Sequence, residues 1–411
     1  MSGVSAIPRV PVLILGKAIT ALGVLRVLAA RGIETYVVDA TSDIITRSRW
    51  YRPAERTLAE TSDSDELATF LQSLRLSRAV LIGCSDKWTQ ALSGLPQEMR
   101  LRFAASVAPP ETIGQFLDKD RFRALVDRLE LPHPRSLPLN SLADLELATD
   151  DDLTNGFLKP TDSPRHNLVF GTKGSFVQSR TAATRVVERG TAAGITFMLQ
   201  EWIPGGMTTT VLIDGFVDRN GTVKGMMARR RLRMNPPRLG NTTAAITVPL
   251  DEVSEATAGL RTLLAEVGYR GVFNAEFKFD QRDGHFKIIE INPRPAWFIA
   301  TIARAGLDLP WMSYLDAQEL PVPAPAPYQT GRYGVYETPD ATAIARAWFS
   351  FQRPDGPILK PWLRGDHALF YWSDPLPAVA DLWRALRGRL RGITGRLLRG
   401  VGRGHPRSRP E

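Results

Sequence analysis

Cysteine and long apolar runs are what this sequence most clearly lacks. One cysteine, Cys84, stands among 411 residues, which excludes an internal disulfide framework and leaves no paired cysteine and histidine spacing for a structural zinc site. We therefore expect a reducing, cytoplasmic setting. No apolar run approaches the roughly 20 residues that cross a bilayer. The apolar stretch from Val10 to Leu15 is interrupted by Pro11 and followed by Lys17, so we interpret it as a strand and not as a signal peptide.

The net positive charge is small in the body and concentrated in the tail. The formal net charge is +9, yet nine arginines and one glutamate lie in residues 384–411, so the remainder carries only about +1. Charge thus gives no reason to expect specific nucleic-acid binding by the body. In the tail, apolar residues recur at every third or fourth position between arginines, as in a basic amphipathic helix, although glycines weaken the pattern. The tail could fold on an anionic membrane surface, pack on the body or stay mobile. The apolar positions are Leu382, Leu386, Leu390, Ile393, Leu397 and Val401.

The first hundred residues have the pattern of a parallel α/β unit. Residues 12–16, 19–30 and 34–39 indicate a strand, a helix and a strand, and residues 65–74 and 78–83 repeat the helix and the strand. The glycines near residue 20 do not make G-x-G-x-x-G, so a dinucleotide oxidoreductase is poorly supported. Ser85 and Asp86 follow the strand at residues 78–83. Ligands in open α/β sheets bind at that end of the strands. Ser85 and Asp86 are candidate substrate contacts, and a helix N-cap explains them equally well.

Two lysines stand at positions suited to phosphate. Asp118 and Lys119 begin an amphipathic helix, whose N-terminus favours anions; Lys119 could also be an ordinary surface lysine. Lys159 ends a short apolar strand at residues 156–160. Farther on, the apolar strand at residues 197–203 breaks into a Pro-Gly loop, which is equally compatible with an edge strand ending in a turn.

The chain is organised around a charged hairpin at residues 275–294. A loop ending in Gly284 would place Glu276 directly opposite Glu290, and alternation would put Ile288 and Asn292 on the same face as Glu290. Like charges opposite each other in a half-buried ladder are destabilising, and a divalent cation such as Mg²⁺, which takes oxygen ligands, would resolve the conflict. The alternative is a solvated polar face.

These motifs, in this order, resemble the ATP-grasp superfamily, and within it the bacterial carboxylate-amine ligases that include D-aspartate ligase. The resemblance covers roughly residues 10–315. It implies ATP and two Mg²⁺ (or Mn²⁺) ions. It also implies metal ligands at Glu276, Glu290 and Asn292, phosphate contacts at Lys119 and Lys159, adenine contacts along Gln200, Glu201, Trp202 and Ile203, and reaction-centre arginines at Arg231, Arg233 and Arg294.

The sequence departs from that resemblance at two places. Where relatives carry a glycine-rich phosphate flap, residues 161–174 contain only Gly171 and Gly174, so side chains such as His166 or Lys173 would have to supply donors. Where relatives carry an acidic residue that reaches the ribose, residues 207–209 read Met-Thr-Thr. The ribose contact stays unassigned.

The expected architecture is therefore α/β, with an ATP-grasp fold preceded by a parallel α/β domain and followed by a small extension. We place the first domain at 1–112 and the ATP-grasp domain at 113–320, with lobes at 113–193 and 194–320. A proline-rich connector and small unit follow at 321–383, and the tail at 384–411.

The function expected from the resemblance is amide formation from a small-molecule carboxylate and an amine, through an acyl phosphate, with release of ADP and phosphate. The alternative is a non-catalytic ATP-binding module tethered by its tail to a membrane or to nucleic acid. The protein would be a monomer or a homodimer in the cytoplasm, either free or peripheral at the inner membrane surface.

Overall fold

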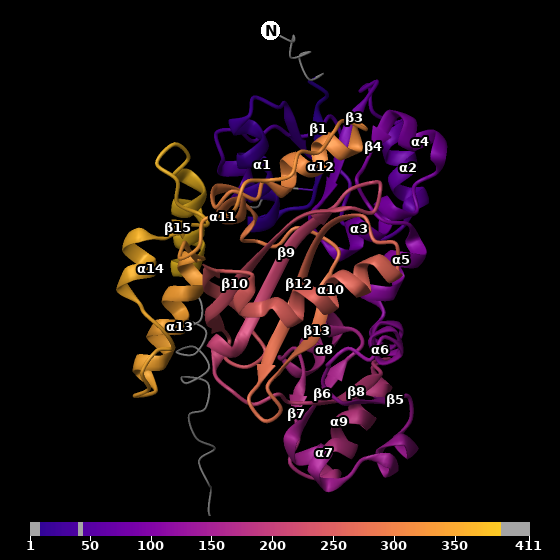
Figure 1. Ribbon diagram of the computed structural model, residues 1–411, viewed down its shortest axis with the longest axis vertical. Helices are drawn as coiled ribbons and strands as arrows, with labels where there is room; N and C mark the ends of the chain where they lie inside the picture. Colours follow the sequence, from indigo (N-terminus) through magenta and orange to yellow (C-terminus); the bar gives the residue numbers. More distant parts are fainter. Residues whose placement is uncertain (1–8, 40–43, 388–411) are drawn as a thin grey trace, which may run out of the picture.

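The computed structural model describes residues 9–39 and 44–387 (Figure 1). Its first unit contains a four-stranded sheet in the order β2-β1-β3-β4, and all of its pairs are parallel, which confirms the predicted parallel α/β opening. The elements are β1 (Val12–Leu15), α1 (Ala18–Ala30), β2 (Thr35–Val37), α2 (Ser64–Gln72), β3 (Ala79–Gly83), α3 (Asp86–Ser93), α4 (Gln97–Arg102) and β4 (Phe103–Ala104).

A small lobe follows, built on an antiparallel sheet in the order β5-β8-β6-β7. The loop expected at residues 161–174 contains a helix, capped by Asp162 at its start and ended by Gly171 in the left-handed region (φ 73°). It is held by His166, which is buried and stacks on Phe170 at 4.5 Å between ring centroids. The elements are α5 (Pro110–Leu117), α6 (Lys119–Arg128), β5 (Ser136–Leu139), α7 (Asp150–Asn155), β6 (Gly156–Pro160), α8 (Ser163–Phe170), β7 (Ser175–Phe176), α9 (Arg180–Ala192) and β8 (Phe197–Glu201).

A seven-stranded sheet in the order β13-β12-β9-β10-β11-β14-β15 forms the centre of the molecule (Figure 1). One of its faces packs against the leucines of the predicted amphipathic helix α10. The opposite face becomes polar toward the small lobe and carries the candidate site. The elements are β9 (Thr210–Val217), β10 (Val223–Asn235), β11 (Asn241–Val248), α10 (Ser254–Glu266), β12 (Gly271–Asp280) and β13 (His285–Asn292).

The hairpin β12–β13 reaches the predicted pairing by a different route. Glu276 does pair with Glu290, but the loop has four residues, 281–284, and a β-bulge lies between Ile288 and Glu290. The extra residue of the bulge offsets the longer loop. It also reverses the faces, because Ile288 pairs with Phe277 in the hydrophobic core while Glu290 faces the other way. The prediction that Ile288 shares the face of Glu290 is wrong.

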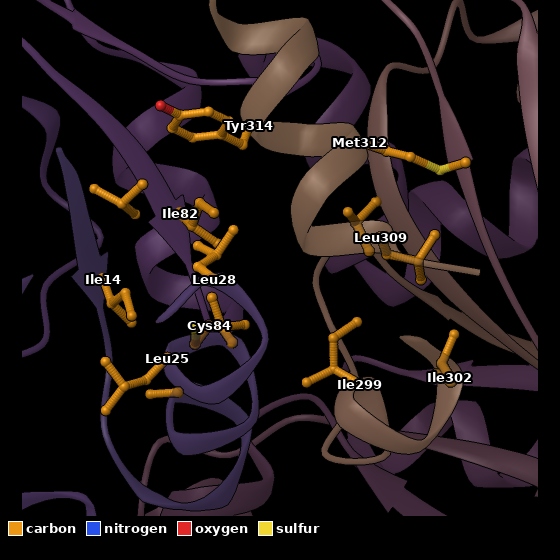
Figure 2. Packing of buried hydrophobic residues seen from close by; sticks show 14 of the residues in the cluster. Ile14, Leu25, Leu28, Ile82, Cys84, Ile299, Ile302, Leu309, Met312 and Tyr314 are labelled. Atoms are coloured by element: carbon orange, nitrogen blue, oxygen red, sulfur yellow. The ribbon is translucent and has the colours of Figure 1, made fainter. Parts of the chain in front are cut away.

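The chain after β13 returns to the first unit. Ile299 and Ile302 of α11 (Ile299–Arg304), together with Met312 of α12 (Leu309–Ala317), pack against α1 and the parallel sheet in one hydrophobic cluster (Figure 2). Cys84 lies in the same cluster, and burial raises the pKa of its thiol to about 12. The first unit is therefore completed by residues far along the sequence.

A small unit lies beyond the proline-rich connector, at the left of Figure 1. It extends the large sheet, since β14 pairs with β11 and β15 with β14. Asp340, which is fully buried, accepts two hydrogen bonds of 2.9 Å from Arg233 on β10, and further bonds from Thr243 and Trp362. The elements are β14 (Tyr333–Val335), α13 (Glu337–Phe349), α14 (Leu359–Arg364) and β15 (Asp366–His367).

No helix in the described ranges is long and apolar enough to cross a membrane. The amphipathic pattern predicted for the tail lies, from residue 388 on, outside those ranges.

The Asp340 contacts predict a large stability effect. Asp340→Ala leaves the guanidinium of Arg233 buried without a counter-charge, which costs about 3–5 kcal/mol. We expect the free energy of unfolding in urea to fall by that amount, and Glu188→Ala, on the exposed side of α9, to change it by less than about 0.5 kcal/mol. Equal stability of the two variants would contradict the proposed docking role.

Candidate functional site

The carboxylate pair of the hairpin lies on the polar face of the large sheet. Glu276 accepts a hydrogen bond of 2.8 Å from Arg231, and Glu290 accepts one of 3.2 Å from the amide of Asn292. The Asn292 Oδ1 atom accepts from Arg294 at 3.1 Å. The structure thus brings together two carboxylates and an amide, as the spacing predicted.

Two lysines approach this patch from the small lobe and its leading helix. Lys119, in the first turn of α6, donates to the carbonyl oxygens of Pro160 and Thr161, so it bridges α6 to the end of β6. Desolvation and the neighbouring Lys159 lower the pKa of Lys119 to about 8, against the opposing effect of Glu290. Lys159 donates to the Gln200 side chain at 3.3 Å. Both lysines are held beside Glu290.

The electrostatics of Glu290 show how strongly cations dominate here. The Glu290 side chain keeps solvent contact. Desolvation by the groups around it, taken alone, would raise the pKa of its carboxyl. The charge of Lys159, the Asn292 hydrogen bond, and the charges of Arg294 and Lys119 outweigh that effect, so the pKa of Glu290 lies below its ordinary value. Glu290 is therefore ionised at neutral pH.

Arg294 joins this patch to the first unit. Its Nε donates to Asp86 at 2.6 Å, so the structure brings one of the two candidate substrate residues to the reaction side. Ser85 instead caps α3, because its Oγ accepts from the backbone of Trp88 at 3.3 Å. The N-cap explanation accounts for Ser85, and the substrate explanation remains open for Asp86.

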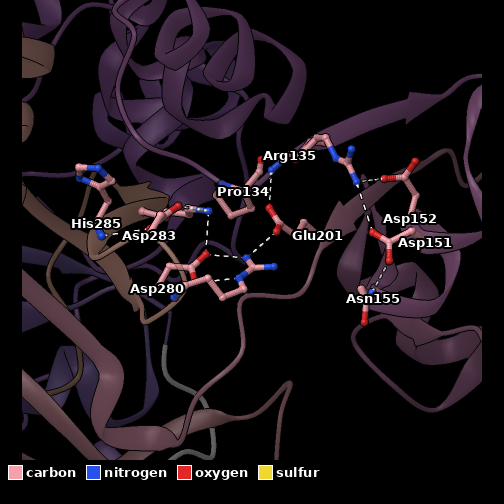
Figure 3. A network of polar contacts seen from close by, with 12 residues as sticks. Pro134, Arg135, Asp151, Asp152, Asn155, Glu201, Asp280, Asp283 and His285 are labelled. Carbon is pink, nitrogen blue, oxygen red and sulfur yellow. Dashed lines mark hydrogen bonds and ion pairs between the residues drawn. The ribbon is translucent and has the colours of Figure 1, made fainter.

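The predicted adenine segment lies at the end of β8 (Figure 3). The Glu201 side chain accepts from the backbone of Arg135 at 3.1 Å and from Arg282 of the hairpin loop at 2.5 Å. It therefore ties the small lobe to the large sheet. The Trp202 backbone N–H donates to Asn155.

The remaining backbone donor of this segment belongs to Ile203. Within the described ranges its N–H makes no hydrogen bond, and its side chain is buried. The Trp202 ring packs edge-on against Phe157 and Phe176, with Lys278 4.8 Å above it. Ile203 is thus the best-placed donor for the edge of a base.

The structure separates the two arginines that the resemblance grouped together. Arg231 is buried on the polar face, held by Thr242 and Glu276. A register irregularity follows it in β10, and Arg233 turns to Asp340 and to the carbonyl of Pro357. Because that guanidinium is enclosed and saturated, we leave Arg233 out of the proposed site.

Two residues reach the site that the sequence argument did not select. Lys173, raised there only as one possible flap donor, is near enough to Glu290 and Glu276 for their charges to act on its pKa, although partial desolvation keeps that pKa lowered. Arg229 lies in the same row of the sheet as Glu276, with only Leu212 of β9 between them. Strand alternation from Arg231 could have found it.

Arg229 is buried, and four of its five N–H donors make no hydrogen bond among the described residues. Its Nε donates to Asp214 at 2.6 Å, and Asp214 accepts from Asn274 at 2.8 Å. Its guanidinium covers the Phe298 ring at 4.4 Å, and its two terminal nitrogens have no hydrogen-bond partner among the described residues.

The donor set fits a hard divalent cation. The described residues contain no cluster of three or more His, Cys, Asp or Glu side chains suited to a metal, so any site here depends on Glu276, Glu290 and Asn292 with further oxygens from a ligand. Mg²⁺ commonly binds in that way, through one or two carboxylates and substrate phosphates. Rotation of the Asn292 amide would turn its oxygen toward a cation held by Glu290.

Sequence comparison finds a ligase and a synthase among the relatives of this chain. No family model matches the chain. It is 24% identical to D-aspartate ligase of Enterococcus faecium over 251 residues, 59% of each protein, so it spans about three fifths of that relative. It is 22% identical over 300 residues to the carbamoyl phosphate synthase large chain of Methanoregula boonei, 68% of this chain and 26% of that one.

Solved structures show the same fold. The biotin carboxylase domain of Hydrogenobacter thermophilus 2-oxoglutarate carboxylase, determined with MgADP, ADP and bicarbonate, matches with a TM-score of 0.61 at 15% identity, over 80% of this chain and 74% of that one. Phosphoribosylglycinamide synthetase of Anaerococcus prevotii matches with a TM-score of 0.58 at 14% identity, over 79% of each. The chain therefore has an ATP-grasp fold, and its sequence is similar to that of D-aspartate ligase.

Proposed function

We propose that the protein is an ATP- and Mg²⁺-dependent ligase that joins a small-molecule carboxylate to an amine as an amide. One observation carries the proposal: five cationic side chains surround the carboxylate pair Glu276 and Glu290. No candidate protein nucleophile lies beside that pair in the described part of the chain. Such a site suits phosphoryl transfer, which needs positioning and charge neutralisation more than covalent help from the protein. The cationic residues are Lys119, Lys159, Lys173, Arg231 and Arg294.

The proposed reaction has two steps. An oxygen of the substrate carboxylate attacks the γ-phosphorus of ATP, the bond to the β–γ bridging oxygen breaks, and ADP leaves with that electron pair. The amine nitrogen then attacks the carbonyl carbon of the acyl phosphate and expels inorganic phosphate, and the amine releases its extra proton to phosphate or solvent. Bound Mg²⁺ would neutralise phosphate charge.

The protein groups have distinct tasks in this scheme. Glu276, Glu290 and Asn292 would hold the metal. Lys119 and Lys159 would contact the phosphates from the small lobe, and Lys173 would cover them in place of a glycine-rich flap. At the base-binding end, the N–H of Ile203 would donate to the adenine edge, with Gln200, Glu201 and Trp202 shaping its surroundings.

On the substrate side, Arg294 and Arg231 would bind the carboxylate or the transferred phosphoryl group. Asp86 would either hold Arg294 in place or receive the amine. A non-catalytic ATP-binding module is the competing function, and it gives no reason for Arg294 and Asp86 to be joined at 2.6 Å beside the phosphate site. Nucleotide release that requires both substrates would distinguish the two.

The remaining proposals concern setting and organisation. We place the protein in the cytoplasm, as a monomer or a homodimer, with limits of 1–112, 113–320, 321–383 and 384–411 for its parts. An anionic membrane surface is proposed as a further partner through residues 384–411.

Glu290→Ala tests the metal role. Removing one carboxylate ligand is expected to lower the rate of ADP release by at least about 10-fold at saturating ATP, because a direct ligand contributes at least as much as the roughly 10–100-fold of its supporting groups. The assay measures ADP release when a carboxylate and an amine are supplied together, starting with D-aspartate and other amino acids. Glu188→Ala on α9 is the matched control. Undiminished turnover in Glu290→Ala would remove the mechanism.

Lys119 predicts a pH dependence. Its pKa of about 8 means that it is charged below pH 8 and neutral above, so its attraction for phosphate is lost as the pH rises. We expect kcat/KM for ATP to fall about tenfold per pH unit above the inflection. Lys119→Arg keeps its charge throughout this range and should abolish the inflection. An unchanged inflection in Lys119→Arg would assign it to another group.

A further inference from the structure

Large exposed apolar side chains gather in the small unit that follows the connector. Among the described residues, sixteen large apolar side chains are at least 38% exposed, and eleven of them lie between residues 348 and 386. Scattered exposed leucines are normal, whereas a concentration of this kind marks an interaction surface. The eleven are Trp348, Phe349, Phe351, Leu359, Leu363, Trp372, Leu376, Val379, Leu382, Trp383 and Leu386.

The helix at residues 376–387 is oriented with its large apolar side chains outward. Leu376, Val379, Trp383 and Leu386, at helical spacing, are each 43–59% exposed. The side toward the protein carries small residues and Asp381, and Ala378 packs against the main hydrophobic cluster. A helix that only covered the body would place these faces the other way round. We call the outward side the apolar face.

The orientation of this helix is fixed at its start. Asp374, just before it, is buried and accepts hydrogen bonds from Arg26 on α1 at 2.9 Å and from Ser48 at 2.8 Å. Arg26 also donates to the carbonyl oxygens of Leu369 and Asp374. The apolar face therefore points away from the body because a buried ion pair holds the helix there.

The exposed charges on this helix are positive, whereas Asp381 lies on its inner side. Arg384 and Arg387 lie on the same helix, and the Arg387 guanidinium is 5.0 Å from the centre of the Trp383 ring. The sequence beyond residue 387 adds seven arginines and one glutamate. Pairing of two copies through this face would bring like charges together across the interface, whereas an anionic surface complements them.

We propose that the apolar face docks on an anionic lipid bilayer. Trp383 and the aliphatic side chains would enter the headgroup region, as interfacial helices place Trp and Leu, and the arginines would contact acidic headgroups. The inference goes beyond the ligase function, since it concerns where the protein works and not what it catalyses. Turnover with water-soluble substrates does not depend on it.

The test is flotation of the full chain with vesicles. One set contains phosphatidylcholine alone and the other contains about 30% phosphatidylglycerol. Each set is measured at near-physiological ionic strength and at high salt, because salt screens electrostatic attraction to the surface. We expect binding to the anionic vesicles that weakens several-fold at high salt. Trp383→Glu, which opposes both insertion and headgroup attraction, should lower the bound fraction several-fold. The matched control is Leu101→Glu on α4, where the side chain is 79% exposed.

Three results would overturn the proposal. The first is no binding to anionic vesicles, and the second is equal binding of Trp383→Glu and the wild type. The third is a concentration-dependent dimer in sedimentation equilibrium that Trp383→Glu abolishes while vesicle binding is unaffected, which would assign the apolar face to a second copy. ADP release by Trp383→Glu in solution, expected to equal that of the wild type, separates this inference from failure of the ligase proposal.

Discussion

Two carboxylates facing each other across adjacent strands are the constraint around which the site is built. Glu276 and Glu290 pair directly in the β12–β13 ladder, an arrangement that like charges disfavour. Cations offset it from three directions: Arg231 from a third strand, Lys159 and Lys119 from the small lobe and its leading helix, and Arg294 from the segment after the hairpin. In the proposed function, this surplus of positive charge would attract the phosphates of the nucleotide.

The fold keeps these groups together by polar contacts between its parts. Arg282 of the hairpin loop contacts Glu201 of the small lobe, and Arg294 contacts Asp86 of the first unit. The first contact crosses a boundary between two parts with separate hydrophobic clusters, the small lobe and the large sheet, whereas the first unit shares a cluster with the large sheet. Binding of ligand between the small lobe and the large sheet would therefore change few apolar contacts, so these two parts have room to adjust to it. Arg233 pairs with Asp340 of the last unit. That pair attaches the last unit to the large sheet and directs Arg233 away from the site.

The last unit exposes large apolar side chains to solvent. Buried pairs such as Arg26 with Asp374 fix its helix, and the helix then presents leucine, valine and tryptophan to solvent. The same chain thus has a polar, cation-rich interior site and an apolar, arginine-rimmed exterior face. The two are chemically independent, and each can be altered without touching the other.

Local signals in the sequence were enough to predict the parallel α/β opening, the helix beginning at Lys119 and the hairpin at residues 275–294. Strand alternation, caps and turn glycines are local, so they can be read without a fold. The pairing of Glu276 with Glu290 was predicted correctly only because the bulge offsets the longer loop. That bulge, the irregularity that directs Arg233 to Asp340, and the positions of Lys173 and Arg229 became visible in the three-dimensional structure alone. These depend on pairing between distant strands, where one inserted residue reverses every side chain that follows.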